Sequence, residues 1–160
     1  MRFALVLLLF FNLIPCDNAN PQSKSLTSLK VKLEISADQS IKNIVSSYIT
    51  RELRSIPDVT IVESDYLRTI SIIATEMEYQ SGENSAGVAI AVVVLQPIDN
   101  SSFDPKLREG LEPVIFRDFR LYTGSSEDLK RICQTIIADF DRETLEPIRI
   151  VFQEYGRFFK

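Results

Sequence analysis

The fold class is decided by residues 88–95, which read Val-Ala-Ile-Ala-Val-Val-Val-Leu. The stretch is apolar at every position, rich in β-branched residues and closed by Pro97. Short runs of this kind are typical of strands buried on both faces, because a half-exposed strand alternates apolar with polar residues. We therefore predict that residues 88–95 form a central strand of a sheet, covered on both sides.

The segments on either side of this run predict further strands. In the first of them Val31, Leu33 and Ile35 alternate with charged residues, which is the pattern of a strand with one face in water. In residues 67–79, Ile70, Ile72 and Ala74 alternate with polar residues, with Ile73 as an exception, and the other two segments are shorter runs. The further strands are expected at residues 30–36, 58–63, 67–79 and 114–122.

Two segments carry apolar residues at helical spacing. The first begins near Ser36 or Asp38 and ends at Pro57, and the second begins near Ser125 and runs through Phe140. Pro147 breaks or kinks the second helix, or starts a fresh one, because proline has no backbone N–H to donate.

The sequence therefore orders its elements β-α-β-β-β-β-α. This order predicts an α+β fold: a mostly antiparallel sheet of four to five strands, with the helices packed on one face. The expected core consists of Leu33, Ile44, Leu53, Ile90, Val92, Phe116, Ile132 and Ile136.

The first residues predict export. Arg2 precedes an apolar run of about 12 residues, which is too short to span the roughly 30 Å of a bilayer core but fits a secretory leader. We expect residues 1–20 to be a signal peptide, residues 21–29 a flexible segment that leads into the domain, and residues 30–160 a single globular α+β domain. The protein is then periplasmic or secreted, with no transmembrane span.

The amino-acid composition excludes several kinds of catalytic and binding site. The chain has no histidine, which excludes histidine-based triads, general bases and metal ligands. Its net charge is −4 without a dense basic patch, so nucleic acid is not an expected partner. Cys133 lies on an apolar helix stripe, where a thiol is usually inert. We expect no catalytic residue, no metal and no cofactor.

A carboxylate-based hydrolase is the alternative from a different class. Two carboxylates can act as general acid and general base without histidine, provided that one pKa is raised and their separation is right. Asp139 and Glu143 are four residues apart and share a helix face, whereas Asp141 points elsewhere. The candidate residues for such an enzyme are Glu76, Glu78, Asp118, Asp139 and Glu143.

Two arginines stand within the apolar strand at residues 114–122. Strand alternation places Arg117 with Phe119 on one face, and Asp118 with Arg120 on the other. The arginines form either an anion site or part of a water-exposed face with cross-strand ion pairs.

Residues 41–79 resemble the amino-terminal domains of TolB-type periplasmic proteins. The similarity lies in a helix that ends in Arg51-Glu52-Leu53, followed by the strand of residues 57–62. It covers about a quarter of the chain. The resemblance implies a module of envelope assembly.

The leading hypothesis is an exported, non-enzymatic domain that binds another envelope or extracellular protein through the exposed sheet face or an edge strand. Arg117, Arg120, Phe158 and Phe159 are the candidate partner surface. A lipid-anchored envelope subunit is a further alternative, because residues 13–16 resemble a lipobox that ends in Cys16, although Pro15 departs from the motif.

The C-terminal segment, residues 147–160, carries an apolar stripe through Ile148, Val151, Phe152 and Tyr155. A short helix needs a packing surface, because it is marginal in water. We expect the stripe to pack on its own domain, so that deletion of residues 147–160 lowers the melting temperature. The alternative is a helix that docks on a partner or a membrane surface.

Overall fold

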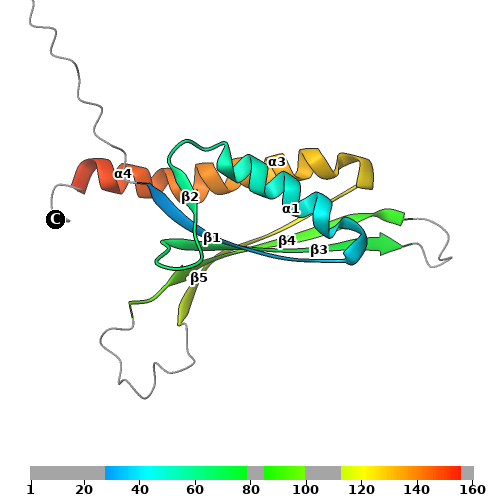
Figure 1. The fold of residues 1–160 in the computed structure, drawn as a ribbon, viewed down its shortest axis with the longest axis horizontal. Helices are drawn as coiled ribbons and strands as arrows, with labels where there is room; N and C mark the ends of the chain where they lie inside the picture. Colours follow the sequence, from blue (N-terminus) through cyan, green and yellow to red (C-terminus); the bar gives the residue numbers. More distant parts are fainter. Residues whose placement is uncertain (1–27, 79–84, 100–112, 156–160) are drawn as a thin grey trace, which may run out of the picture.

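The computed structural model describes residues 28–78, 85–99 and 113–155. These residues form one five-stranded sheet with helices on one of its faces (Figure 1). The α+β prediction is therefore confirmed. The elements in chain order are β1 (Leu29–Ala37), α1 (Gln39–Arg54), β2 (Val59–Ile61), β3 (Arg68–Glu78), β4 (Ser85–Pro97), β5 (Val114–Gly124), the 3-10 turn η1 (Ser126–Asp128), α3 (Leu129–Phe140), the π-helical segment η2 (Asp141–Leu145) and α4 (Glu146–Tyr155).

The sheet is mostly antiparallel, as expected, but it is mixed rather than purely antiparallel. The strand order is β2-β1-β3-β4-β5, with β1 parallel to both β2 and β3. The pairs β3–β4 and β4–β5 are antiparallel. The parallel pair β1–β2 follows from α1, because a helix between two strands returns the chain to the same end of the sheet.

The core lies between the sheet and the helix layer formed by α1, α3 and α4 (Figure 1). Five of the eight predicted core residues are buried: Leu53, Ile90, Val92, Ile132 and Ile136. Leu33 is half-buried. Ile44 and Phe116 were predicted wrongly, because they are 45% and 60% exposed. The buried stripe of α1 repeats every four residues from Ile41 and leaves Ile44 on its flank, and Phe116 lies on the sheet face that has no helix over it.

Strand β4 is interior in the sheet but has helices over only one face, which corrects the prediction for residues 88–95. Val88, Ile90, Val92 and Val94 are buried toward the helices. The alternate residues, which begin at Ala89, are only half-buried on the other face. All the described helices lie on the same side of the sheet, so no helix of the described residues covers the opposite side (Figure 1).

The helical segments after β5 run on through Pro147 by way of a widened turn. Pro147 has no N–H for the carbonyl of Glu143, four residues earlier, and the π-helical segment η2 ends two residues before it. Leu145 in this segment is buried, and Ile148 and Phe152 of α4 pack against the core. None of the helices in residues 28–155 that the structure describes is long and apolar enough to cross a membrane.

Gly87 is expected to tolerate no side chain. Its φ of 139° is a conformation that residues with a Cβ rarely adopt, and a Cβ built on it would collide with the carbonyl oxygen of Gly124 on β5. We expect Gly87→Ala to lower the free energy of unfolding by about 1–3 kcal/mol, measured by urea denaturation. Ala89→Gly, two residues further along β4, is the control for a change of backbone entropy alone, and an unchanged midpoint for Gly87→Ala would contradict this reading.

Candidate functional site: the two faces of strand β5

Strand β5 contains a β-bulge that alters the direction of one arginine. Val94 of β4 lies opposite Asp118 and Leu95 lies opposite Phe116, so that Arg117 is the extra residue. The bulge places Arg117 on the helix-covered side beside Asp118, where its Nε donates a hydrogen bond of 2.8 Å to Oε1 of Gln96. The predicted pairing of Arg117 with Phe119 on one face is therefore wrong, because a bulge interrupts strand alternation.

On the helix-covered side β5 borders a cleft with a volume of about 640 Å³. The apolar wall of the cleft is formed by four residues of α4: Pro147, Ile148, Val151 and Phe152. The sheet contributes three guanidinium groups, those of Arg68, Arg117 and Arg120, and the cleft also contains the carboxylates of Asp118 and Glu143.

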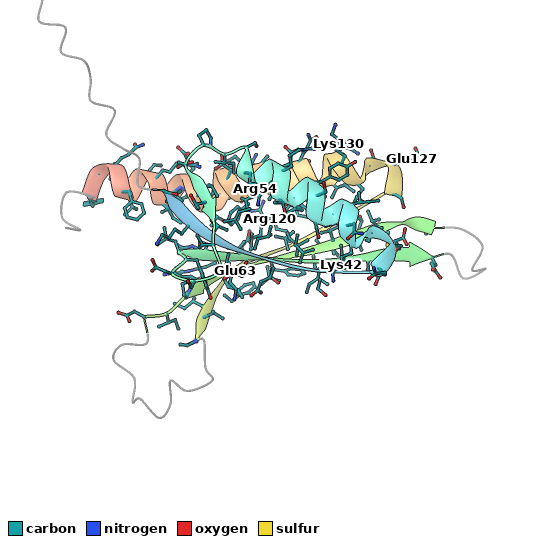
Figure 2. The ribbon with its side chains drawn as sticks, in the orientation of Figure 1. Lys42, Arg54, Glu63, Arg120, Glu127 and Lys130 are labelled. Atoms are coloured by element: carbon teal, nitrogen blue, oxygen red, sulfur yellow. The ribbon has the colours of Figure 1, made fainter. Side chains whose placement is uncertain are left out.

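Arg120 is the centre of an ion-pair network at the side of this cleft (Figure 2). Its Nε lies 2.8 Å from Oδ2 of Asp118, its Nη1 lies 3.6 Å from Oδ2 of Asp139, and its Nη2 bonds to Glu143. The hydroxyl of Tyr122 donates to Asp139 at 2.9 Å. Arg120 therefore connects β5 to α3 and η2 rather than forming a cross-strand pair.

This network places three of the five hydrolase candidates around one guanidinium group. The bonds from Arg120 and Arg142 lower the pKa of Glu143 to about 2. A general acid needs the opposite shift, because it must hold its proton near neutral pH. Glu143 is therefore held as a carboxylate, in a structural ion pair.

The two remaining candidates lie at the other end of the sheet. Glu76 is near the C-terminal end of β3, where its Oε2 accepts a 2.6 Å hydrogen bond from Ser40 Oγ. Six residues of extended strand, about 20 Å, separate Glu76 from Ile70. Ile70 lies opposite Val94 of β4, and Val94 in turn lies opposite Asp118 of β5. Glu76 and Glu78 are thus not brought together with the carboxylates around Arg120.

Arg68 and Arg117 differ from Arg120 because neither forms an ion pair with any residue that the structure describes. Among the described residues, Arg68 donates a side-chain hydrogen bond only to the carbonyl of Leu67, and Arg117 only to Gln96. Burial and the charge of Arg117 together lower the pKa of Arg68. Sequence reasoning missed Arg68, since an arginine at the start of a strand has no pattern that marks it.

The face of the sheet without helices carries an exposed apolar surface. Ile73, Phe116, Phe119 and Leu121 are each at least half exposed. The strand register joins them through β4, since Ala91 lies opposite both Ile73 and Leu121, and Val93 lies opposite Phe119. We call this surface the apolar patch; it consists of Ile73, Ala91, Val93, Leu95, Phe116, Phe119 and Leu121.

Two other residues that the sequence pattern marks are either buried in the core or bound in an ion pair within the domain. Cys133 is fully buried, and burial raises the pKa of its thiol to about 11. Asp141 binds Arg149 rather than sharing a site with Asp139. No group of three metal-ligating side chains occurs within residues 28–78, 85–99 and 113–155. Cys16, Phe158 and Phe159 lie outside the described residues.

Comparison with known proteins gives limited similarity. No model of a known protein family matches the chain, and no curated protein matches it. Among solved structures, a dodecamer of a PelC variant from Paraburkholderia phytofirmans is 15% identical, with coverage of 69% of this chain and 83% of that one, at a TM-score of 0.39. The hypothetical protein CT253 from Chlamydia trachomatis is 9% identical, with coverage of 69% and 94% and a TM-score of 0.43. A minor lipoprotein from Acinetobacter baumannii is 11% identical, with coverage of 68% and 90% and a TM-score of 0.30.

Proposed function

We propose that this chain is an exported, non-enzymatic domain that binds another protein through the apolar patch and the outer edge of β5. The observation that carries the proposal is the patch itself. Four large apolar side chains that are at least half exposed lie together on one sheet face. Contiguous exposed apolar surface of this kind marks interaction sites in soluble proteins.

The surroundings of the patch support a protein partner. Beyond the patch, the open face continues over β1, where Lys30, Lys32 and Glu34 provide charged side chains. An apolar centre with a polar rim is the usual composition of a protein interface. Among the described strands β5 pairs with β4 alone, so its outer backbone groups can accept an added strand.

The leader predicted at residues 1–20 supports a site of action in the periplasm or outside the cell. The partner is then an envelope or extracellular protein. In this proposal the carboxylates and arginines of the β5 region serve structure and binding rather than catalysis.

Site-specific photo-crosslinking in envelope preparations of the source cells tests this proposal. A crosslinker at position 119 in the patch is expected to capture one defined protein, whereas a crosslinker at position 44 is expected to capture none. Ile44 is the matched control, because it is also a large exposed apolar residue but lies on α1, away from the patch. Equal patterns at both positions, or no product at position 119, would refute the proposal.

A variant separates binding from folding. Leu121→Asp is expected to reduce the crosslink yield at position 119 at least tenfold, because it places a charge in the apolar contact. Its unfolding midpoint should stay close to that of the wild type, since Leu121 is 60% exposed. A full crosslink yield from Leu121→Asp would show that the patch is not the contact surface.

A further inference from the structure

The cleft between β5 and α4 is a separate site on the other face of the sheet from the apolar patch. We propose that this cleft binds a single-chain anionic amphiphile of the fatty-acid class, with its carboxylate between Arg68 and Arg117 and its alkyl chain along α4.

The two arginines are placed to share one anion. Thr69 of β3 lies opposite Leu95 of β4, so that Arg68 is beside Gln96, the residue that Arg117 contacts from the other side. Two strand spacings of about 4.8 Å separate the backbones of β3 and β5, a span that two long side chains bridge readily. A carboxylate can accept paired hydrogen bonds from guanidinium groups.

The charge of these two arginines is not balanced within the described part of the chain. The carboxylates that line the cleft, Asp118 and Glu143, are already bonded to Arg120. Arg68 and Arg117 repel each other, and the repulsion contributes to the lowered pKa of Arg68. Like charges held together at a cost in stability are expected where a ligand supplies the opposite charge.

The rest of the cleft is suited to an alkyl chain. Pro147, Ile148, Val151 and Phe152 form a continuous apolar wall next to the arginine pair. Ile148 and Phe152 also pack against the core, so this wall is held in place by the fold. A volume of about 640 Å³ lies within the range of small-molecule sites. A free phosphate or another small anion would leave the apolar wall in contact with water.

Isothermal titration with decanoate, below its critical micelle concentration, tests the proposal on the full mature chain. We expect saturable binding of one decanoate per chain. Decanol and acetate, which carry the tail or the head alone, should each bind at least tenfold more weakly. Equal affinity for decanol would overturn the proposal, as would binding that appears only with micelles. Decyl phosphate that binds tenfold more tightly than decanoate would overturn the assignment to fatty acids.

Variants assign the binding to the cleft. Arg68→Gln with Arg117→Gln is expected to weaken decanoate binding at least tenfold, and Val151→Asn to weaken it several-fold. Arg131→Gln is the control, because Arg131 is an exposed arginine of α3, near Lys130 at the far end of the helix layer (Figure 2). An equal loss in Arg131→Gln would show a general charge effect and would refute the assignment.

A thermal measurement distinguishes a binding role of the arginines from a structural one. Without ligand, the double variant is expected to melt at or slightly above the wild-type temperature, because it removes the repulsion between Arg68 and Arg117. Decanoate should raise the melting temperature of the wild type and leave that of the double variant unchanged. A double variant that melts several degrees lower would show that the arginines stabilise the fold and would overturn the proposal.

Discussion

Replacement of Ile136 by alanine is expected to lower the free energy of unfolding by about 2–5 kcal/mol. Ile136 is 1% exposed in the middle of α3, which packs against both α1 and the sheet. The loss combines the transfer free energy of the missing methyl and methylene groups with the cost of the cavity that remains. Urea denaturation followed by circular dichroism measures it.

The matched control is Ile44→Ala. The same atoms are removed from a helix residue that is 45% exposed, so the expected change is within about 0.5 kcal/mol. A loss below about 0.5 kcal/mol for Ile136→Ala would mean that the apolar stripe of α3 does not face the core. Because the two substitutions differ only in burial, their difference reports the contribution of packing.

The second large effect is expected at the ion pair that fastens α4 to the rest of the domain. Nε and Nη2 of Arg149 lie 2.7 and 2.9 Å from the two carboxylate oxygens of Asp58, and the side chains of this pair are 13% and 12% exposed. Arg149 also binds Asp141 and Glu146. We expect Arg149→Ala to cost about 2–4 kcal/mol, because it leaves the carboxylate of Asp58 without its partner in a largely buried place.

A double variant tests whether the cost comes from the unpaired charge. Asp58→Leu combined with Arg149→Met removes both charges, and it should recover part of the stability that Arg149→Ala loses. If the losses in free energy of unfolding at positions 58 and 149 simply add in the double variant, the two side chains do not interact. Strong destabilisation by Arg149→Ala would also support the prediction that deletion of residues 147–160 lowers the melting temperature.

The ion pair between Asp58 and Arg149 also makes the free energy of unfolding depend on pH. The hydrogen bonds from Arg149 lower the pKa of Asp58 below its ordinary value. A carboxylate with a lowered pKa in the folded state contributes its full stabilisation above the unfolded-state pKa of about 3.9, and loses it as the pH falls toward the folded-state value. Arg149→Ala should therefore lose less stability than the wild type between about pH 5 and pH 2. An equal loss in both proteins would contradict this role of Asp58.

Part of this molecule could be predicted from local sequence patterns. The repeats of apolar residues that begin at Ile41 and at Leu129 predicted α1 and α3, and residues 88–95 predicted an interior strand. These signals are local, because side-chain periodicity depends only on the backbone conformation of the same segment. The β-α-β-β-β-β-α order and the α+β class follow from them.

The candidate sites could be predicted only in part. Arg117 and Arg120 were singled out from the apolar strand that contains them. The structure gives them different surroundings: Arg117 bonds to Gln96 and has no ion pair among the described residues, whereas Arg120 is the centre of an ion-pair network. This difference depends on the bulge and on carboxylates from α3 and η2. Phe116 was expected in the core and is on the open face instead, since an apolar side chain does not indicate which side of a sheet the helices will cover.

The sequence by itself determined which segments become helices and strands, and it excluded histidine chemistry. Only the tertiary structure decided which sheet face the described helices cover, that β1 runs parallel to its neighbours, and that Arg68 and Arg117 line the same cleft. It also decided the pairing of Asp58 with Arg149, which are 91 residues apart. The physical reason is that periodicity is a property of one segment, whereas packing partners are chosen by the burial of the whole chain.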